Sequence, residues 1–213
     1  RYADEQARMR RESPTDDVIS RLLAPTIDGE QLTDREFKNF FVLMVSAGND
    51  TTRYSMAAAM KALIDHPDQM AELRDSIGTN PSLMDSAVEE MLRWATVTMH
   101  FRRTATRDVE MHGKQIKAGD KVVIWFVSAN YDGDQFPEPY RFDIHRTPNE
   151  HVAFGRMSPH LCLGAQLARM ELKVLFEELL PRIADAQLAG AVDRLRSNFI
   201  SGMKRLPVTV AVA

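Results

Sequence analysis

The chain has 213 residues, of which 44% are hydrophobic and 27% are charged, a composition that predicts a folded protein and excludes a disordered one. Its 27 basic and 30 acidic residues give a formal net charge of −3, which disfavours nucleic-acid binding. The single cysteine, Cys162, excludes an internal disulfide and a multi-cysteine metal site and is compatible with a cytoplasmic location. No apolar run reaches the roughly 20 residues that a membrane-spanning helix needs, so we expect no membrane anchor in this segment. The first residues resemble neither an initiator sequence nor a signal peptide, so we expect the chain to begin inside a larger protein.

Turn signals and hydrophobic periodicity predict a helical first half. Thr33 and Glu36 fit a capping box at the start of an unusually long helix. His66-Pro67 ends that helix, and Asn80-Pro81 supplies an N-cap and a first-turn proline for a later one. The expected helices cover residues 4–11, 16–23, 33–65, 67–76 and 81–94.

The second half is predicted to be mixed. Alternating polarity between residues 101 and 124, with turns at His112-Gly113 and at 118–120, predicts a small antiparallel sheet. A proline-rich loop from residue 136 leads to Cys162, a helix follows over 163–183, and a strand is expected over 208–212. The fold class is therefore mainly α with a small antiparallel β-sheet.

Cys162 stands just before the last long helix, where free backbone N–H groups and the helix dipole favour a thiolate. A lone cysteine is more often a small buried apolar residue, so the residue alone does not decide between the two roles. The surrounding loop favours the functional one. It supplies glycines that allow close backbone approach, an aromatic ring that can shield the sulfur, and a histidine: Gly155, Gly164, Phe154 and His160.

This loop resembles the signature loop of cytochrome P450 haem-thiolate monooxygenases, in which Phe, Gly, His or Arg, Cys and Gly follow in this order. The resemblance implies that Cys162 is the axial ligand of a haem b (iron protoporphyrin IX) and that His160 reaches a haem propionate. The loop departs from the commonest spacing by one residue, and Arg156-Met157-Ser158 stands where glycine is usual. A positive φ at Ser158 would cost about 1 kcal/mol.

The long helix carries a polar insert, Ala47-Gly48-Asn49-Asp50-Thr51-Thr52. Taken alone, it could be a packing glycine beside a solvated face. It is similar to the oxygen-activation motif of the same family. That similarity implies that the Thr51 hydroxyl hydrogen-bonds dioxygen, that Asp50 assists proton delivery, and that Gly48 leaves room for the oxygen.

Glu90 and Arg93 lie three residues apart on one predicted helix face, a spacing that usually gives a weak surface pair. They resemble the family's Glu-x-x-Arg element, which pairs with an arginine from a Pro-x-Arg-Phe segment. Pro139-Tyr140-Arg141-Phe142 matches that segment, so the resemblance makes Arg141 the third member, with Arg146 as the alternative. The trio is expected to be structural.

Phe101-Arg102-Arg103-Thr104-Ala105 resembles the strand whose arginine binds a haem propionate, and the alignment favours Arg103, with Arg102 left as an exposed edge-strand arginine. Family position also implies a substrate pocket of mostly apolar residues, although such stripes are more often plain core. The expected pocket residues are Met44, Ala47, Val97, Thr98, Met99, Phe199 and Ile200.

The resemblance spans nearly the whole chain, and family members are considerably longer. Residues 1–213 are therefore interpreted as the carboxy-terminal haem-binding part of a single cytochrome P450 domain of soluble bacterial type, with the amino-terminal half absent. The implied activity of the intact parent is hydroxylation of an apolar substrate, such as a terpenoid, steroid or fatty acid, with O2 and two electrons from a ferredoxin or flavoprotein. That donor is expected to dock near Cys162, attracted by Arg156, Arg169 and Lys173. Two alternatives are a non-catalytic haem-binding or structural remnant and a helical adaptor without a cofactor.

Overall fold

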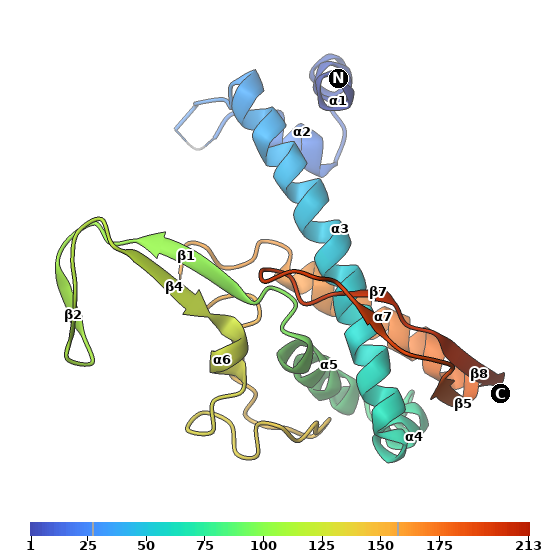
Figure 1. The fold of residues 1–213 in the computed structure, drawn as a ribbon. Coiled ribbons are helices and arrows are strands. Elements are labelled where there is room, and N and C mark those ends of the chain that lie inside the picture. Colours follow the sequence, from blue (N-terminus) through green and yellow to red (C-terminus); the bar gives the residue numbers. More distant parts are fainter. Residues whose placement is uncertain (27, 157) are drawn as a thin grey trace. The chain divides into compact units, whose positions relative to one another are not determined.

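The computed structural model describes residues 1–26, 28–156 and 158–213 (Figure 1). The chain forms two compact units, residues 1–50 and 51–213, and each is described by itself. The helix α3 (Asp34–Asp65) contributes to both units.

The first unit contains α1 (Tyr2–Glu12), α2 (Val18–Leu23) and the beginning of α3. The predicted capping box of α3 is confirmed, because the Thr33 N–H donates to Glu36 Oε2 (2.9 Å) and the Glu36 N–H donates to Thr33 Oγ1 (3.3 Å). Ala7 and Phe37 are buried in this unit. It carries no strand among its described residues.

The second unit is built on the remainder of α3 together with α4 (Pro67–Ser76), α5 (Pro81–Ala95) and α7 (Ala165–Leu179). These helices enclose one hydrophobic core, to which each contributes side chains with no exposed surface: Leu63, Leu73, Met91, Leu172 and Phe176. The proline breaks at His66-Pro67 and Asn80-Pro81 lie where they are predicted, although the Asn80 side chain accepts from the Ser82 hydroxyl and caps no backbone N–H.

Among its described residues, the second unit has four two-stranded antiparallel sheets. The predicted sheet consists of β1 (His100–Thr104) paired with β4 (Lys121–Trp125) and of a β2–β3 hairpin (Val109–Met111, Lys114–Ile116). The predicted last strand, β8 (Val208–Val212), pairs with β5 (Ile183–Leu188), and β6 (Asp193–Arg194) pairs with β7 (Met203–Arg205). The sequence predicted none of β5, β6 and β7.

Two helical details differ from expectation. A short helix, α6 (Phe126–Asn130), follows β4 and was not predicted. The last helix ends at Leu179 rather than near residue 183, since Pro181 converts the chain into a 3₁₀ turn, Leu180–Arg182, that leads into β5. None of the helices in the described ranges is long and apolar enough to cross a bilayer.

Candidate functional site

The loop that carries Cys162 is closed by backbone hydrogen bonds. The Cys162 N–H donates to the Phe154 carbonyl (2.9 Å), and the Ala165 N–H donates to the Cys162 carbonyl (3.2 Å). Gly155 has a φ of +73°, a conformation that suits glycine, at the turn between Phe154 and the rest of the loop. The Cys162 side chain is exposed. The loop therefore presents its sulfur to the surface of the unit while its backbone is fixed to Phe154.

Cys162 lies two residues before Gly164, the N-cap of α7. A Cβ added to Gly164 would lie 4.0 Å from Cys162 Sγ, an ordinary van der Waals contact. The sulfur therefore belongs to a residue just ahead of a 15-residue helix. Met157, part of the predicted Arg156-Met157-Ser158 departure, lies outside the described residues.

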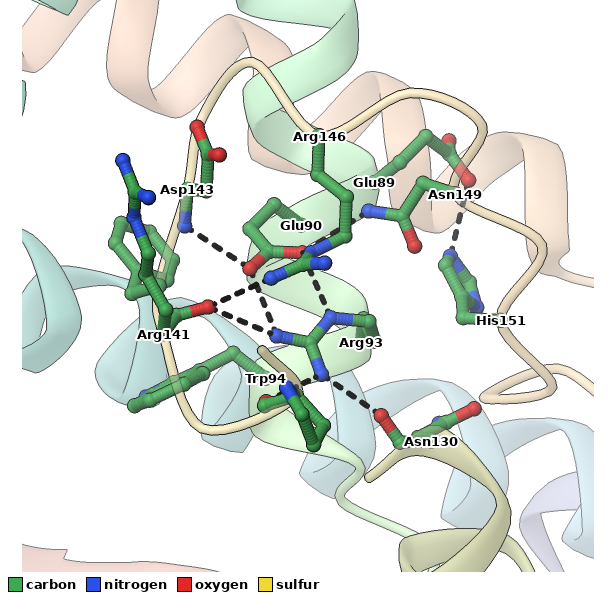
Figure 2. Close-up of polar contacts among 12 residues, drawn as sticks. Glu89, Glu90, Arg93, Trp94, Asn130, Arg141, Asp143, Arg146, Asn149 and His151 are labelled. Atoms are coloured by element: carbon green, nitrogen blue, oxygen red, sulfur yellow. Dashed lines mark hydrogen bonds and ion pairs between the residues drawn. The ribbon is translucent and has the colours of Figure 1, made fainter. Parts of the chain in front are cut away.

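A buried charge cluster joins α5 to the segment that precedes this loop (Figure 2). Glu90 and Arg93 have no exposed side-chain surface. The Arg93 guanidinium donates two parallel hydrogen bonds to the Glu90 carboxylate, at 2.7 and 2.8 Å. Its Nη1 donates to the carbonyls of Asn130 (2.7 Å) and Pro139 (3.0 Å). The Glu-x-x-Arg pair is thus a buried bidentate pair and not a surface one.

The third member of the cluster is Arg146, the alternative in the sequence analysis, and the prediction of Arg141 is wrong. Arg146 Nε donates to Glu90 Oε2 (3.1 Å), and the Arg146 side chain is only 8% exposed. Arg141 turns its carbonyl toward the cluster, where it accepts from Arg93 (3.4 Å) and Arg146 (2.9 Å). Its own guanidinium therefore points outward and pairs with Glu138.

Asn130, at the end of α6, was missed by the sequence analysis. Its buried side chain donates to Thr96 Oγ1 (2.9 Å) and accepts from the Val152 N–H (2.8 Å), and its carbonyl accepts from Arg93. One amide therefore joins the end of α5 to the start of the cysteine loop. An isolated Asn in an unpredicted helix gives no sequence signal for this role.

A second network joins α5 to α7 and to the loop. The Arg169 guanidinium donates to both oxygens of Glu89, with Nη2 at 2.9 Å from Oε2, and its Cζ lies 4.8 Å from the centre of the Phe154 ring. His151 Nε2 lies 3.0 Å from Glu89 Oε2. Burial by itself would raise the pKa of Glu89, but the hydrogen bonds from His151 and Arg169 outweigh it and lower that pKa to about 2.

The three cations expected to attract an electron donor are each paired with a carboxylate. Arg169 pairs with Glu89, Lys173 with Asp85, and Arg156 with Glu150. These side chains remain partly exposed, and their role in attracting an electron donor stays a prediction.

The predicted pocket segments meet in the second unit. Thr98 and Ile200 form an isolated antiparallel bridge, the Met99 N–H donates to the Phe199 carbonyl (2.9 Å), and the Ser201 N–H donates to the Val97 carbonyl (2.7 Å). Val97 is buried. These residues are thus neighbours through their backbones.

A cavity of about 900 Å³ opens beside this bridge, and of the five predicted pocket residues in the second unit only Met99 lines it. The cavity is rich in aromatic side chains: Tyr54, Trp94, Trp125, Tyr131 and Tyr140.

Comparison with known proteins decides the family. Residues 2–183 match the family model described as Cytochrome P450. The chain belongs to the cytochrome P450 family. It is 44% identical over 209 residues to a methyl-branched lipid omega-hydroxylase of Mycobacterium bovis, covering 98% of this chain and 48% of that protein. It is 41% identical over 207 residues to a steroid C26-monooxygenase of the same organism, covering 97% and 46%.

The fold agrees with solved cytochrome P450 structures. The Mycobacterium marinum cytochrome P450 CYP268A2 in complex with pseudoionone is 43% identical, with a TM-score of 0.90, covering 97% of this chain and 49% of that one. CYP108D1 from Novosphingobium aromaticivorans is 42% identical with a TM-score of 0.91, covering 100% and 50%. The chain spans about half the length of these relatives.

The residues of the cytochrome P450 loop fit a haem by their chemistry. Cys162 offers an exposed sulfur donor next to a helix N-terminus. His160 is exposed. Arg103 is also exposed on β1, where it donates to the Arg102 carbonyl (3.0 Å) and lies 5.9 Å from the Phe101 ring centre. A guanidinium held by a neutral carbonyl and a ring suits an anionic propionate. Their roles toward haem stay predictions.

The oxygen motif of the family lies within α3, which continues through it as a helix. A Cβ on Gly48 would meet no described atom within 4 Å. The Thr51 carbonyl accepts from the Ser55 hydroxyl (2.9 Å). Gly48, Asp50, Met44 and Ala47 belong to the first unit and Thr51 to the second. The oxygen and substrate roles of these residues stay predictions.

Proposed function

We propose that the chain is the carboxy-terminal haem-binding part of a cytochrome P450 monooxygenase that hydroxylates an apolar, lipid-like substrate. The observation that carries this is the exposed sulfur of the single cysteine, Cys162, whose backbone N–H donates to the Phe154 carbonyl in a loop that resembles the family signature ahead of α7. The relatives named for methyl-branched lipids and steroids support the substrate class. The substrate is proposed to be a branched fatty acid, terpenoid or steroid.

In this proposal, residues of the chain bind the haem, transfer protons and support the cysteine loop. Haem bound through a thiolate supplies the activation of O2. Cys162 is its ligand, and Arg103 and His160 bind its propionates. The Thr51 hydroxyl and the Asp50 carboxylate hold and pass protons at the oxygen site, and Gly48 keeps that site open. Glu90, Arg93 and Arg146 hold the segment that leads into the cysteine loop.

Electrons are proposed to come from a separate ferredoxin or flavoprotein in the cytoplasm. The donor is proposed to dock on the face near Cys162, with Arg156, Arg169 and Lys173 as the attracting cations, each of which also forms an ion pair with a carboxylate.

The test is the reduced carbon-monoxide difference spectrum of the haem-loaded protein. We expect a thiolate-type band in the wild type and its loss in Cys162→Ala, because Cys162 is the only cysteine in the sequence. Leu163→Ala, at the exposed neighbouring residue, is the matched control and should keep the band. A thiolate-type band that survives in Cys162→Ala contradicts the proposal.

A non-catalytic haem-binding or structural remnant is the second candidate, and the observation that favours it is Arg156-Met157-Ser158 in the cysteine loop, where glycine is usual. Haem titration of the 213-residue chain separates the two. Stoichiometric uptake with peroxide-supported hydroxylation of a methyl-branched fatty acid supports the enzyme. Haem uptake without hydroxylation, in the chain and in any longer polypeptide that contains it, supports the remnant.

A further inference from the structure

Two ion pairs connect α5 to α7, one turn apart on each helix. Asp85 pairs with Lys173 (2.6 Å), and Glu89 pairs with Arg169. The first pair ends at the surface, where the Asp85 side chain is 63% exposed. The second is less exposed and continues into the loop that carries Cys162. Both pairs join the same two helices, but only the pair of Glu89 and Arg169 contacts the cysteine loop.

The first connection to the loop runs through His151, whose side chain is 2% exposed. The Ala153 N–H donates to His151 Nδ1 (3.2 Å), so Nδ1 must be the acceptor nitrogen. Nε2 then carries the proton that is donated to Glu89 Oε2 at 3.0 Å. Figure 2 shows His151 aimed at Glu89. The carboxylate thus fixes both the orientation and the tautomer of a histidine at the start of the loop.

The second connection runs through Arg169. Glu89 holds the guanidinium by two hydrogen bonds, and the same guanidinium lies over the Phe154 ring. The Phe154 carbonyl accepts the Cys162 N–H. A continuous set of contacts therefore leads from Glu89 to the backbone of the cysteine.

We propose that Glu89 is a positioning residue for Cys162, which acts by fixing residues 151–154 through His151 and Arg169. The ionised state of Glu89 agrees with this role, because its lowered pKa keeps the carboxylate charged at neutral pH. The importance of this role for catalysis rests on the proposed function, in which Cys162 binds haem. The structural link between Glu89 and the backbone of Cys162 does not depend on that function.

A simpler role for Glu89 is to pack α5 against α7, as Asp85 does. Asp85→Asn is therefore the matched control, because it removes a carboxylate charge from the same helix one turn earlier and leaves the loop contacts intact. Glu89→Gln is the test variant. His151→Gln is the second test variant, because it cuts the loop side of the network and keeps the Glu89–Arg169 pair.

The test measures amide hydrogen exchange of the haem-free protein, with peptides covering residues 151–164. In Glu89→Gln and His151→Gln we expect this segment, including the Cys162 amide, to exchange about tenfold faster, since charge-assisted hydrogen bonds that close it are lost. In Asp85→Asn we expect its exchange to be unchanged. The α5 peptide over residues 83–92 reports packing of the helices and should stay protected in all three variants.

Two results would overturn the proposal. One is unchanged exchange of the loop in both Glu89→Gln and His151→Gln. The other is acceleration in Asp85→Asn equal to that in Glu89→Gln, which would assign the effect to helix packing. Because this measurement needs no haem, it remains informative even if the carbon-monoxide spectrum contradicts the proposed function. In the haem-loaded protein, a smaller share of the thiolate-type band in Glu89→Gln than in Asp85→Asn would extend the role to the bound state.

Discussion

Glu90 accepts hydrogen bonds from Arg93, Arg146, Asn149 and the backbone of Asp143, although its side chain is fully buried. A buried carboxylate is stable only when charged and polar donors replace the water it has lost. Arg93 alone supplies two of these donors, and the segment before the cysteine loop supplies the others. The carboxylate therefore couples the folding of that irregular segment to α5.

Arg146→Ala and Arg141→Ala form a matched pair of variants that tests which arginine stabilises this coupling. Arg146→Ala removes a charged partner of Glu90 and is expected to lower the free energy of unfolding by about 2–3 kcal/mol. Arg141→Ala removes an exposed pair with Glu138 and should cost about 0.5 kcal/mol or less. Urea unfolding of both variants measures the difference. Equal losses would contradict the assignment.

The choice between these arginines shows what the sequence can and cannot predict at this scale. The resemblance of the Glu-x-x-Arg motif to that of the family singled out Glu90 and Arg93, which both stand in a regular helix and are paired in the structure. Arg141 and Arg146 lie in a segment without periodicity, so nothing in the sequence tells which side chain turns inward. His151 and Glu89 were missed for a similar reason, since their partnership joins residues 62 apart in the chain.

At the scale of elements, the sequence predicts the helices and strands that have a clear hydrophobic periodicity or a strong signal at one end. The long α3 was predicted by its capping box and by the His66-Pro67 break. The strand β5 was not, because its buried residues, Ile183 and Ala186, are three apart rather than two. A shift of register between Ile183 and Asp185 accounts for that spacing. The two-residue β6 is too short to carry any pattern.

Among the glycines of the described residues, Gly202, just before β7, leaves the least room for a side chain, because it packs against Tyr54 of α3. A Cβ on Gly202 would lie 2.9 Å from the Tyr54 ring, so Gly202→Ala must displace that ring. We expect it to destabilise the protein by about 1–3 kcal/mol. Gly133→Ala, where a Cβ meets no described atom within 4 Å, is the control and should have little effect. Thermal unfolding measures both, and a neutral Gly202→Ala would show that Tyr54 can rotate away freely.

At the scale of the whole molecule, α7 is apolar on two opposite faces. Leu172 and Phe176 point into the core. Leu163 just before the helix, together with Leu167, Met170 and Val174 on it, recurs at helical spacing and is 52–82% exposed. An exposed apolar stripe of this kind is typical of a surface that another protein surface covers.

We therefore expect the 213-residue chain to self-associate at micromolar concentration and to bind a hydrophobic dye. Leu167→Lys combined with Val174→Lys should reduce both, since two charges interrupt the stripe. The control is Val208→Lys combined with Val210→Lys, which adds the same charge at residues that are 40% and 45% exposed on β8. Sedimentation measures the association. Equal reduction by both double variants would show that net charge, and not the α7 stripe, governs it.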